Sequence, residues 1–96
     1  MTTGYSGTVV SLTGLIAVIT PPQCRMARTA LLIGVRELAE ASGVSAMTIT
    51  RFESSKSGGY ASTLEKLKRA LELAGVEFIA ENGGGPGVRF KKEKQE

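Results

Sequence analysis

The stretch RELAEASGVSAMTITRFES, residues 36–54, decides the fold predicted for this chain. Two short segments flank Gly43, and a glycine tolerates the backbone angles of a sharp turn. Before the turn, the small Ala39 allows two helices to approach each other closely. After it, Ile49 and Phe52 lie three residues apart and form the inner stripe of a second helix. The pattern predicts two helices packed across a tight turn.

This arrangement is typical of a helix-turn-helix, whose second helix enters the major groove of DNA. The small residue, the glycine and the spaced apolar positions, with their flanking helices, resemble the lambda-repressor-like family of the xenobiotic-response-element type. The resemblance extends over about residues 20–76, more than half of the chain. It implies a mainly α fold: a four-helix helix-turn-helix domain that binds DNA.

Capping signals place the first helix. Thr20 is a good N-cap, Pro21 suits the first helical position, and Gln23 completes a capping box with Thr20. Cys24 begins an apolar repeat at helical spacing and should face the core. Gly34 is expected to end this helix.

The other elements follow from similar signals. The second and third helices are expected at residues 35–42 and 45–54. A capping box of Ser62 and Glu65 predicts the start of a fourth helix at residues 62–74. Its buried stripe is expected to comprise Leu64, Leu67, Leu71 and Ala74.

Two short strand-like runs, residues 76–79 and 88–90, flank a glycine-rich turn and predict a short C-terminal β-hairpin. The chain is therefore divided into an N-terminal extension (residues 1–19), a DNA-binding domain (residues 20–75) and a hairpin with a basic tail (residues 76–96). The last part is a possible dimerisation element, and residues 9–19 are a second candidate.

The N-terminal extension leaves three interpretations open. Residues 1–8 are rich in Thr, Gly and Ser and are expected to be disordered. Residues 9–19 can pair with a strand, cover an apolar patch, or reflect a misassigned start codon. They are too few to span a membrane, and no basic side chain precedes them as in a signal peptide. A cytoplasmic location is expected.

The composition argues against a disulfide, a metal site and catalytic activity. The chain has 96 residues, a net charge of +3, no histidine and a single cysteine, so neither an intrachain disulfide nor a metal site is expected. No nucleophile and base form a recognisable motif, so we expect no enzyme and no cofactor. The modest positive charge suits nucleic acid, although it also suits ordinary solubility.

The outer face of the third helix carries the predicted base contacts. By the resemblance, Ala46, Met47, Thr50 and Arg51 on this face meet base edges or nearby phosphates. Arg51 is the strongest candidate, because arginine can donate two hydrogen bonds to guanine. Ala46 and Met47 depart from the family, which often has polar side chains there. They can contact a thymine methyl group, or Met47 can serve as an interaction surface or a core filler.

Phosphate contacts are expected at helix starts, where backbone amides and a partial positive charge attract anions. The start of the second helix supplies one contact in this family, and Val35 and Arg36 occupy this place. Ser45 offers a second site, and Lys56 in the following loop is a third candidate, unless it is simply solvated.

The resemblance also implies an ion pair between Arg28 of the first helix and Glu53 at the end of the third. The pair is predicted to be partly buried and to fix the third helix against the first, which is a structural role.

Two functions compete. The first is a sequence-specific transcriptional regulator, a repressor that binds double-stranded DNA as a homodimer with half-sites about 34 Å apart. The alternative is an antitoxin that binds a toxin partner and represses its own operon, which Ala46 and Met47 favour because they suit a protein surface.

Overall fold

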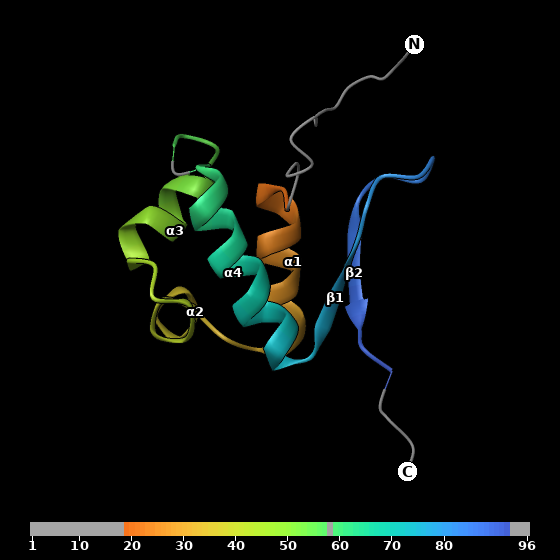
Figure 1. Ribbon diagram of the computed structural model, residues 1–96, viewed down its shortest axis with the longest axis horizontal. Coiled ribbons are helices and arrows are strands. Elements are labelled where there is room, and N and C mark those ends of the chain that lie inside the picture. Colours follow the sequence, from red (N-terminus) through yellow and green to blue (C-terminus); the bar gives the residue numbers. More distant parts are fainter. Residues whose placement is uncertain (1–18, 58, 93–96) are drawn as a thin grey trace.

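A computed structural model describes residues 19–57 and 59–92 of the chain. Within them lie the helices α1 (Pro21–Leu31), α2 (Val35–Ser42), α3 (Ala46–Glu53) and α4 (Ala61–Ala74) and the strands β1 (Val76–Ile79) and β2 (Gly87–Phe90). The helices α1 and α4 pack in the centre, with α2 and α3 on one side and the hairpin on the other (Figure 1). The predicted architecture, mainly helical with a C-terminal hairpin, is confirmed. No helix of the described part is long and apolar enough to cross a membrane.

The core lies where the four helices meet β1. Ile49 and Phe52, which the sequence placed inside, are buried, and so is Leu38. Ala74 was expected in the buried stripe but is exposed, because it is the last residue of α4, where the chain turns toward β1. The other buried apolar side chains are Ile19, Cys24, Ala27, Val44, Leu67, Leu71 and Val76.

Helix α1 begins at the predicted residue and ends before the predicted end at Gly34. The amide of Gln23 donates to Thr20 Oγ1 at 3.2 Å, and the amide of Thr20 donates to Gln23 Oε1 at 2.8 Å, which completes the capping box. The helix ends before Gly34, because Leu32 adopts a left-handed conformation with φ of 60°. The amides of Leu32 and Ile33 then close the last turn, and Gly34 is the N-cap of α2.

Helix α4 begins one residue earlier than expected. Tyr60 is its N-cap, in an extended conformation, and accepts the amide of Leu64 at 2.9 Å. Ser62 therefore lies inside the first turn, where its hydroxyl cannot cap the helix, and the predicted capping box with Glu65 is wrong.

The hairpin is an integral part of the fold. Its strands pair antiparallel, with Val76 opposite Phe90 and Phe78 opposite Val88. Val76 is fully buried, and Phe78 and Val88 pack against the core. The side chain of Gln23 donates to the carbonyl oxygens of Ile79 (3.1 Å) and Gly87 (2.9 Å), so that α1 holds both strands.

Of the N-terminal extension, the structure describes only Ile19, which is buried in the core. The expectations for residues 1–18 lie outside the described residues.

Candidate functional site

The outer face of α3 is an exposed surface of mixed chemistry. It presents side chains from two successive turns: Ala46, Met47, Thr50 and Arg51, all exposed. Met47 is 64% exposed, which excludes a role as a core filler. The opposite face carries Ile49 and Phe52 into the core, so α3 has one buried and one open side.

The turn before α3 orients this surface. Gly43 has φ of +79°, a backbone conformation that residues with a side chain rarely adopt, and it ends α2. Val44 is buried directly after it and fixes the turn to the core. The Ser45 hydroxyl accepts the amide of Thr48 at 3.1 Å, which caps α3 as predicted.

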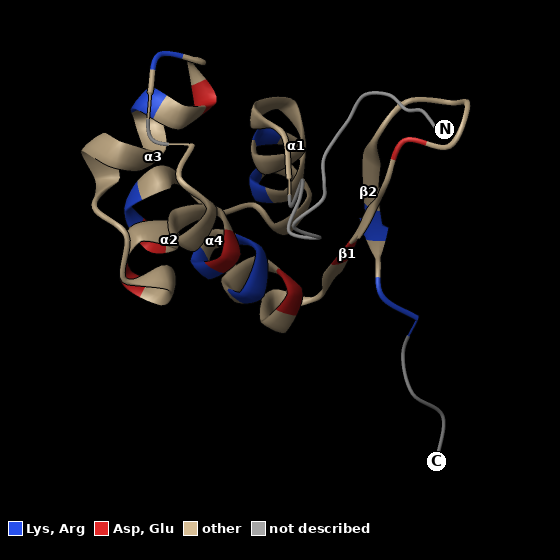
Figure 2. Cartoon of the chain, turned by 45° about the horizontal axis from the view of Figure 1, so that its top comes forward, with Lys and Arg blue, Asp and Glu red and all other residues tan. Residues whose placement is uncertain are grey.

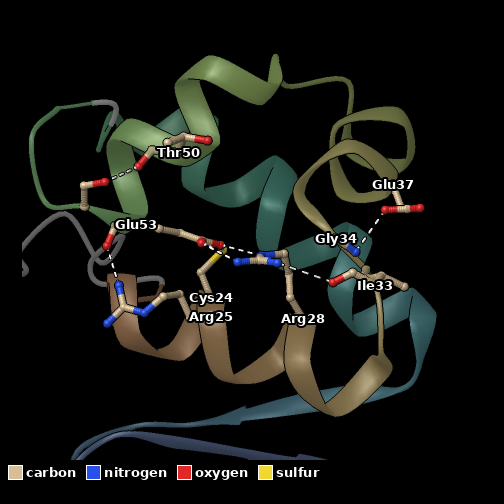
Figure 3. Close-up of polar contacts among 9 residues, drawn as sticks. Cys24, Arg25, Arg28, Ile33, Gly34, Glu37, Thr50 and Glu53 are labelled. Carbon is tan, nitrogen blue, oxygen red and sulfur yellow. Dashed lines mark hydrogen bonds and ion pairs between the residues drawn. The ribbon is translucent and has the colours of Figure 1, made fainter.

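The end of α3 is fixed to α1 by the predicted ion pair. Arg28 Nε lies 2.8 Å from Glu53 Oε2, and Arg28 Nη2 lies 2.7 Å from Glu53 Oε1, so the guanidinium holds the carboxylate with two parallel hydrogen bonds (Figure 3). The side chains of Arg28 and Glu53 are only 19% and 8% exposed. Bidentate pairs of this kind are geometrically specific as well as strong.

Two further side chains of α1 bind Glu53, and neither contact was predicted. Cys24 Sγ donates to Glu53 Oε2 at 3.1 Å, and Arg25 Nη1 donates to the backbone carbonyl of Glu53. Cys24 lies four residues before Arg28, so that both face the same side of a helix. This spacing is the sequence signal that could have placed the thiol beside the carboxylate.

The network shifts three ionisation equilibria. Burial strongly raises the pKa of the Cys24 thiol, and the hydrogen bond to Glu53 adds to this effect. Burial also raises the pKa of Glu53, but the hydrogen bonds from Arg28 and Cys24 and the nearby positive charges outweigh it, and the pKa is lowered overall. The hydrogen bond to Glu53 raises the pKa of Arg28. Cys24 is thus a protonated, buried thiol, unlike a redox-sensing thiolate.

The start of α2 is less open to a phosphate than the sequence suggested. Val35 is partly buried against the core, while Arg36 is exposed. The carboxylate of Glu37 accepts the amide of Gly34 at 2.9 Å, which places a negative charge at this helix end. A phosphate at this end would meet that charge.

The start of α4 offers an alternative that the sequence did not predict. Among the described residues, no side chain caps this helix, and its first turn contains no acidic residue. Backbone amides at a helix start attract anions. The sequence did not indicate this site, because the Ser62 hydroxyl was expected to accept hydrogen bonds from these amides.

Basic residues lie around α3. Figure 2 shows them on α3 itself and in the loop that follows it. Lys56 is exposed, and its amide donates to the carbonyl of Arg51 at 2.8 Å, which folds this loop back onto the end of α3. Within the described residues, no group of three or more acidic, cysteine or histidine side chains could hold a metal ion.

No protein-family model and no curated protein matches the chain. Function must therefore be inferred from the geometry and chemistry of the residues around α3.

Proposed function

We propose that the chain is a sequence-specific DNA-binding transcriptional regulator, a repressor of the lambda-repressor-like helix-turn-helix type. In this proposal α2 and α3 form the helix-turn-helix, and α3 enters the major groove of double-stranded DNA. The protein acts in the cytoplasm as a homodimer, without a cofactor or catalytic activity.

The observation that carries the proposal is the contrast between the two sides of α3. One side is fixed to α1 by the ion pair of Arg28 and Glu53 and by buried apolar side chains. The other side is exposed along two helical turns. A rigid helix with an open face suits the major groove, which is wide enough to admit an α-helix.

The polar groups fit distinct roles in such a complex. Arg51 can donate two hydrogen bonds to the O6 and N7 atoms of guanine, and Thr50 can reach a neighbouring base or phosphate. Lys56, Arg36 and the amides at the start of α4 can contact phosphates. Phosphate contacts would set the position of the protein on the duplex without reading the sequence.

Selection from a pool of randomised DNA duplexes tests the proposal. We expect the wild type to enrich a pseudo-palindrome and Arg51→Ala to lose one base preference. Arg69→Ala is the matched control, because Arg69 is an exposed arginine of α4, outside α3. Salt-sensitive binding without any enriched sequence would mean that the contacts are mostly to phosphate, and would reject the proposed function.

A homodimer interface is proposed at the hairpin, whose two strands have no further strand beside them in the described sheet. Phe90, at the end of β2, is 62% exposed. Deletion of the hairpin would remove Val76 from the core, so a point substitution is the better test. We expect Phe90→Ser to sediment as a monomer where the wild type is a dimer; an unchanged mass would exclude this interface.

The antitoxin function remains a second candidate because exposed apolar side chains also lie outside α3. Leu32 is 89% exposed and Leu73 is 81% exposed. Such side chains suit a protein partner better than DNA. A neighbouring gene that encodes a small toxic enzyme, and co-purification of its product with this chain, would favour this function.

A further inference from the structure

We propose that the first turn of α3 selects thymine through its 5-methyl group, beside a guanine read by Arg51. This inference rests on the proposed function and names the class of DNA sequence that the same surface recognises. Its starting point is the exposure of Ala46 and Met47, two side chains that carry no hydrogen-bond donor. Met47 in particular is 64% exposed at the open end of the helix.

The polar side chains that flank Ala46 and Met47 in the sequence are already engaged. The hydroxyl of Ser45 lies 2.9 Å from the hydroxyl of Thr48 and also accepts the Thr48 amide. These groups therefore satisfy one another within the capping turn. The surface that the first turn offers to a ligand is mainly hydrocarbon.

Major-groove chemistry then favours one base. Thymine alone presents a methyl group in the major groove, next to its O4 acceptor, while guanine, cytosine and adenine present hydrogen-bonding atoms and no methyl group. Covering those polar atoms with Ala46 and Met47 would remove their water without replacing its hydrogen bonds, which is unfavourable. Covering a thymine methyl group removes apolar surface from water and is favourable.

The position of Arg51 sets the spacing of the two bases. Met47 and Arg51 are four residues apart, about 6 Å along the axis of an α-helix. Successive base pairs are about 3.4 Å apart along the duplex. The thymine and the guanine should therefore lie within about two base pairs of each other in each half-site.

Replacing thymine by uracil in the selected duplex tests the proposal at a single methyl group. With the wild type, we expect uracil at the contacted position to weaken binding about fourfold, the effect of about 0.8 kcal/mol for one buried methyl or methylene group. Met47→Gln should bind the thymine and uracil duplexes equally, and should shift the selected base toward adenine, which glutamine recognises. Leu73→Gln, at an exposed apolar position of α4, should retain the uracil effect.

Two outcomes would overturn the inference, and they differ in what they say of the function. If a sequence is enriched but uracil is tolerated at every position, Met47 does not read thymine, although the regulator function stands. If no sequence is enriched at all, the proposed function and this inference fail together.

Discussion

Helix α1 holds the two sides of the molecule by different chemistry. Toward α3, Arg28 and Cys24 bind the carboxylate of Glu53 in a charged network. Toward the hairpin, Gln23 binds the backbone carbonyls of β1 and β2 through an uncharged amide. The charged contact fixes the helix that we propose to read DNA, and the neutral contact fixes the proposed dimer element.

The two contacts should respond differently to substitution and to pH. Removal of either the carboxylate or the guanidinium leaves the other as an unpaired buried charge, which is costly. Loss of the Gln23 amide leaves two uncharged backbone carbonyls without a donor, which is a smaller penalty. The charged contact also responds to pH, whereas the amide does not titrate. Four predictions test this comparison.

The largest effect is expected from Glu53→Ala. Removal of the carboxylate leaves Arg28, whose side chain is 19% exposed, without its partner. We expect the free energy of unfolding to fall by about 3 kcal/mol, the lower end for a broken buried pair. Denaturant unfolding measures this change. Glu65→Ala, at an exposed glutamate of α4, is the control. If the unfolding midpoint of Glu53→Ala equalled that of the wild type, the ion pair would have no structural importance.

A smaller effect is expected from Gln23→Ala. Gln23 is 3% exposed, and its loss removes hydrogen bonds to both strands and to the N-cap Thr20. We expect the free energy of unfolding to fall by about 2 kcal/mol. Gln23→Glu sharpens the test, because it keeps the shape but sets a carboxylate oxygen against two carbonyl oxygens. If Gln23→Glu were more stable than Gln23→Ala, the amide would not be the group that holds the hairpin.

The two contacts also show what the sequence can and cannot predict. Helix starts at Thr20 and Ser45 were found because the capping signal lies within a few residues. The pair of Arg28 and Glu53 was reached only through a family resemblance. The contact of Gln23 with Ile79 was missed, because 56 residues separate the two and no local pattern connects them.

The exposed face of α3 was predictable because, like the capping signals, it follows from residues close together in the sequence. Once Ile49 and Phe52 are assigned to the core, helical periodicity places Met47 and Arg51 outside. The start of α4 was not predictable, since it depends on a shift of one residue. The helix begins one residue earlier than expected, and among the described residues no side chain caps it.

Acid should weaken only the charged contact. The pKa of Glu53 is lowered in the folded state, below the 4.5 of an ordinary glutamate. Its contribution to stability is therefore complete above pH 4.5 and is lost as the pH falls through the folded pKa. The loss amounts to about 1.4 kcal/mol for each unit by which the pKa is lowered.

Unfolding measured between pH 7 and pH 3 tests this expectation. Gln23→Ala should lose stability toward acid as steeply as the wild type does. Glu53→Gln, which does not titrate, should lose less. Parallel curves for the wild type and Glu53→Gln would show that the carboxylate is not the titrating group.

The smallest change in stability is expected from Arg51→Ala, on the side of α3 that neither contact holds. The side chain is exposed, and its backbone carbonyl, which accepts the amide of Lys56, remains after the substitution. We expect the free energy of unfolding to change by no more than about 0.5 kcal/mol. The same variant should lose a base preference in the DNA selection. A variant that lost stability as well would show that the reading face and the holding face of α3 are not separate, because Arg51 would then take part in both.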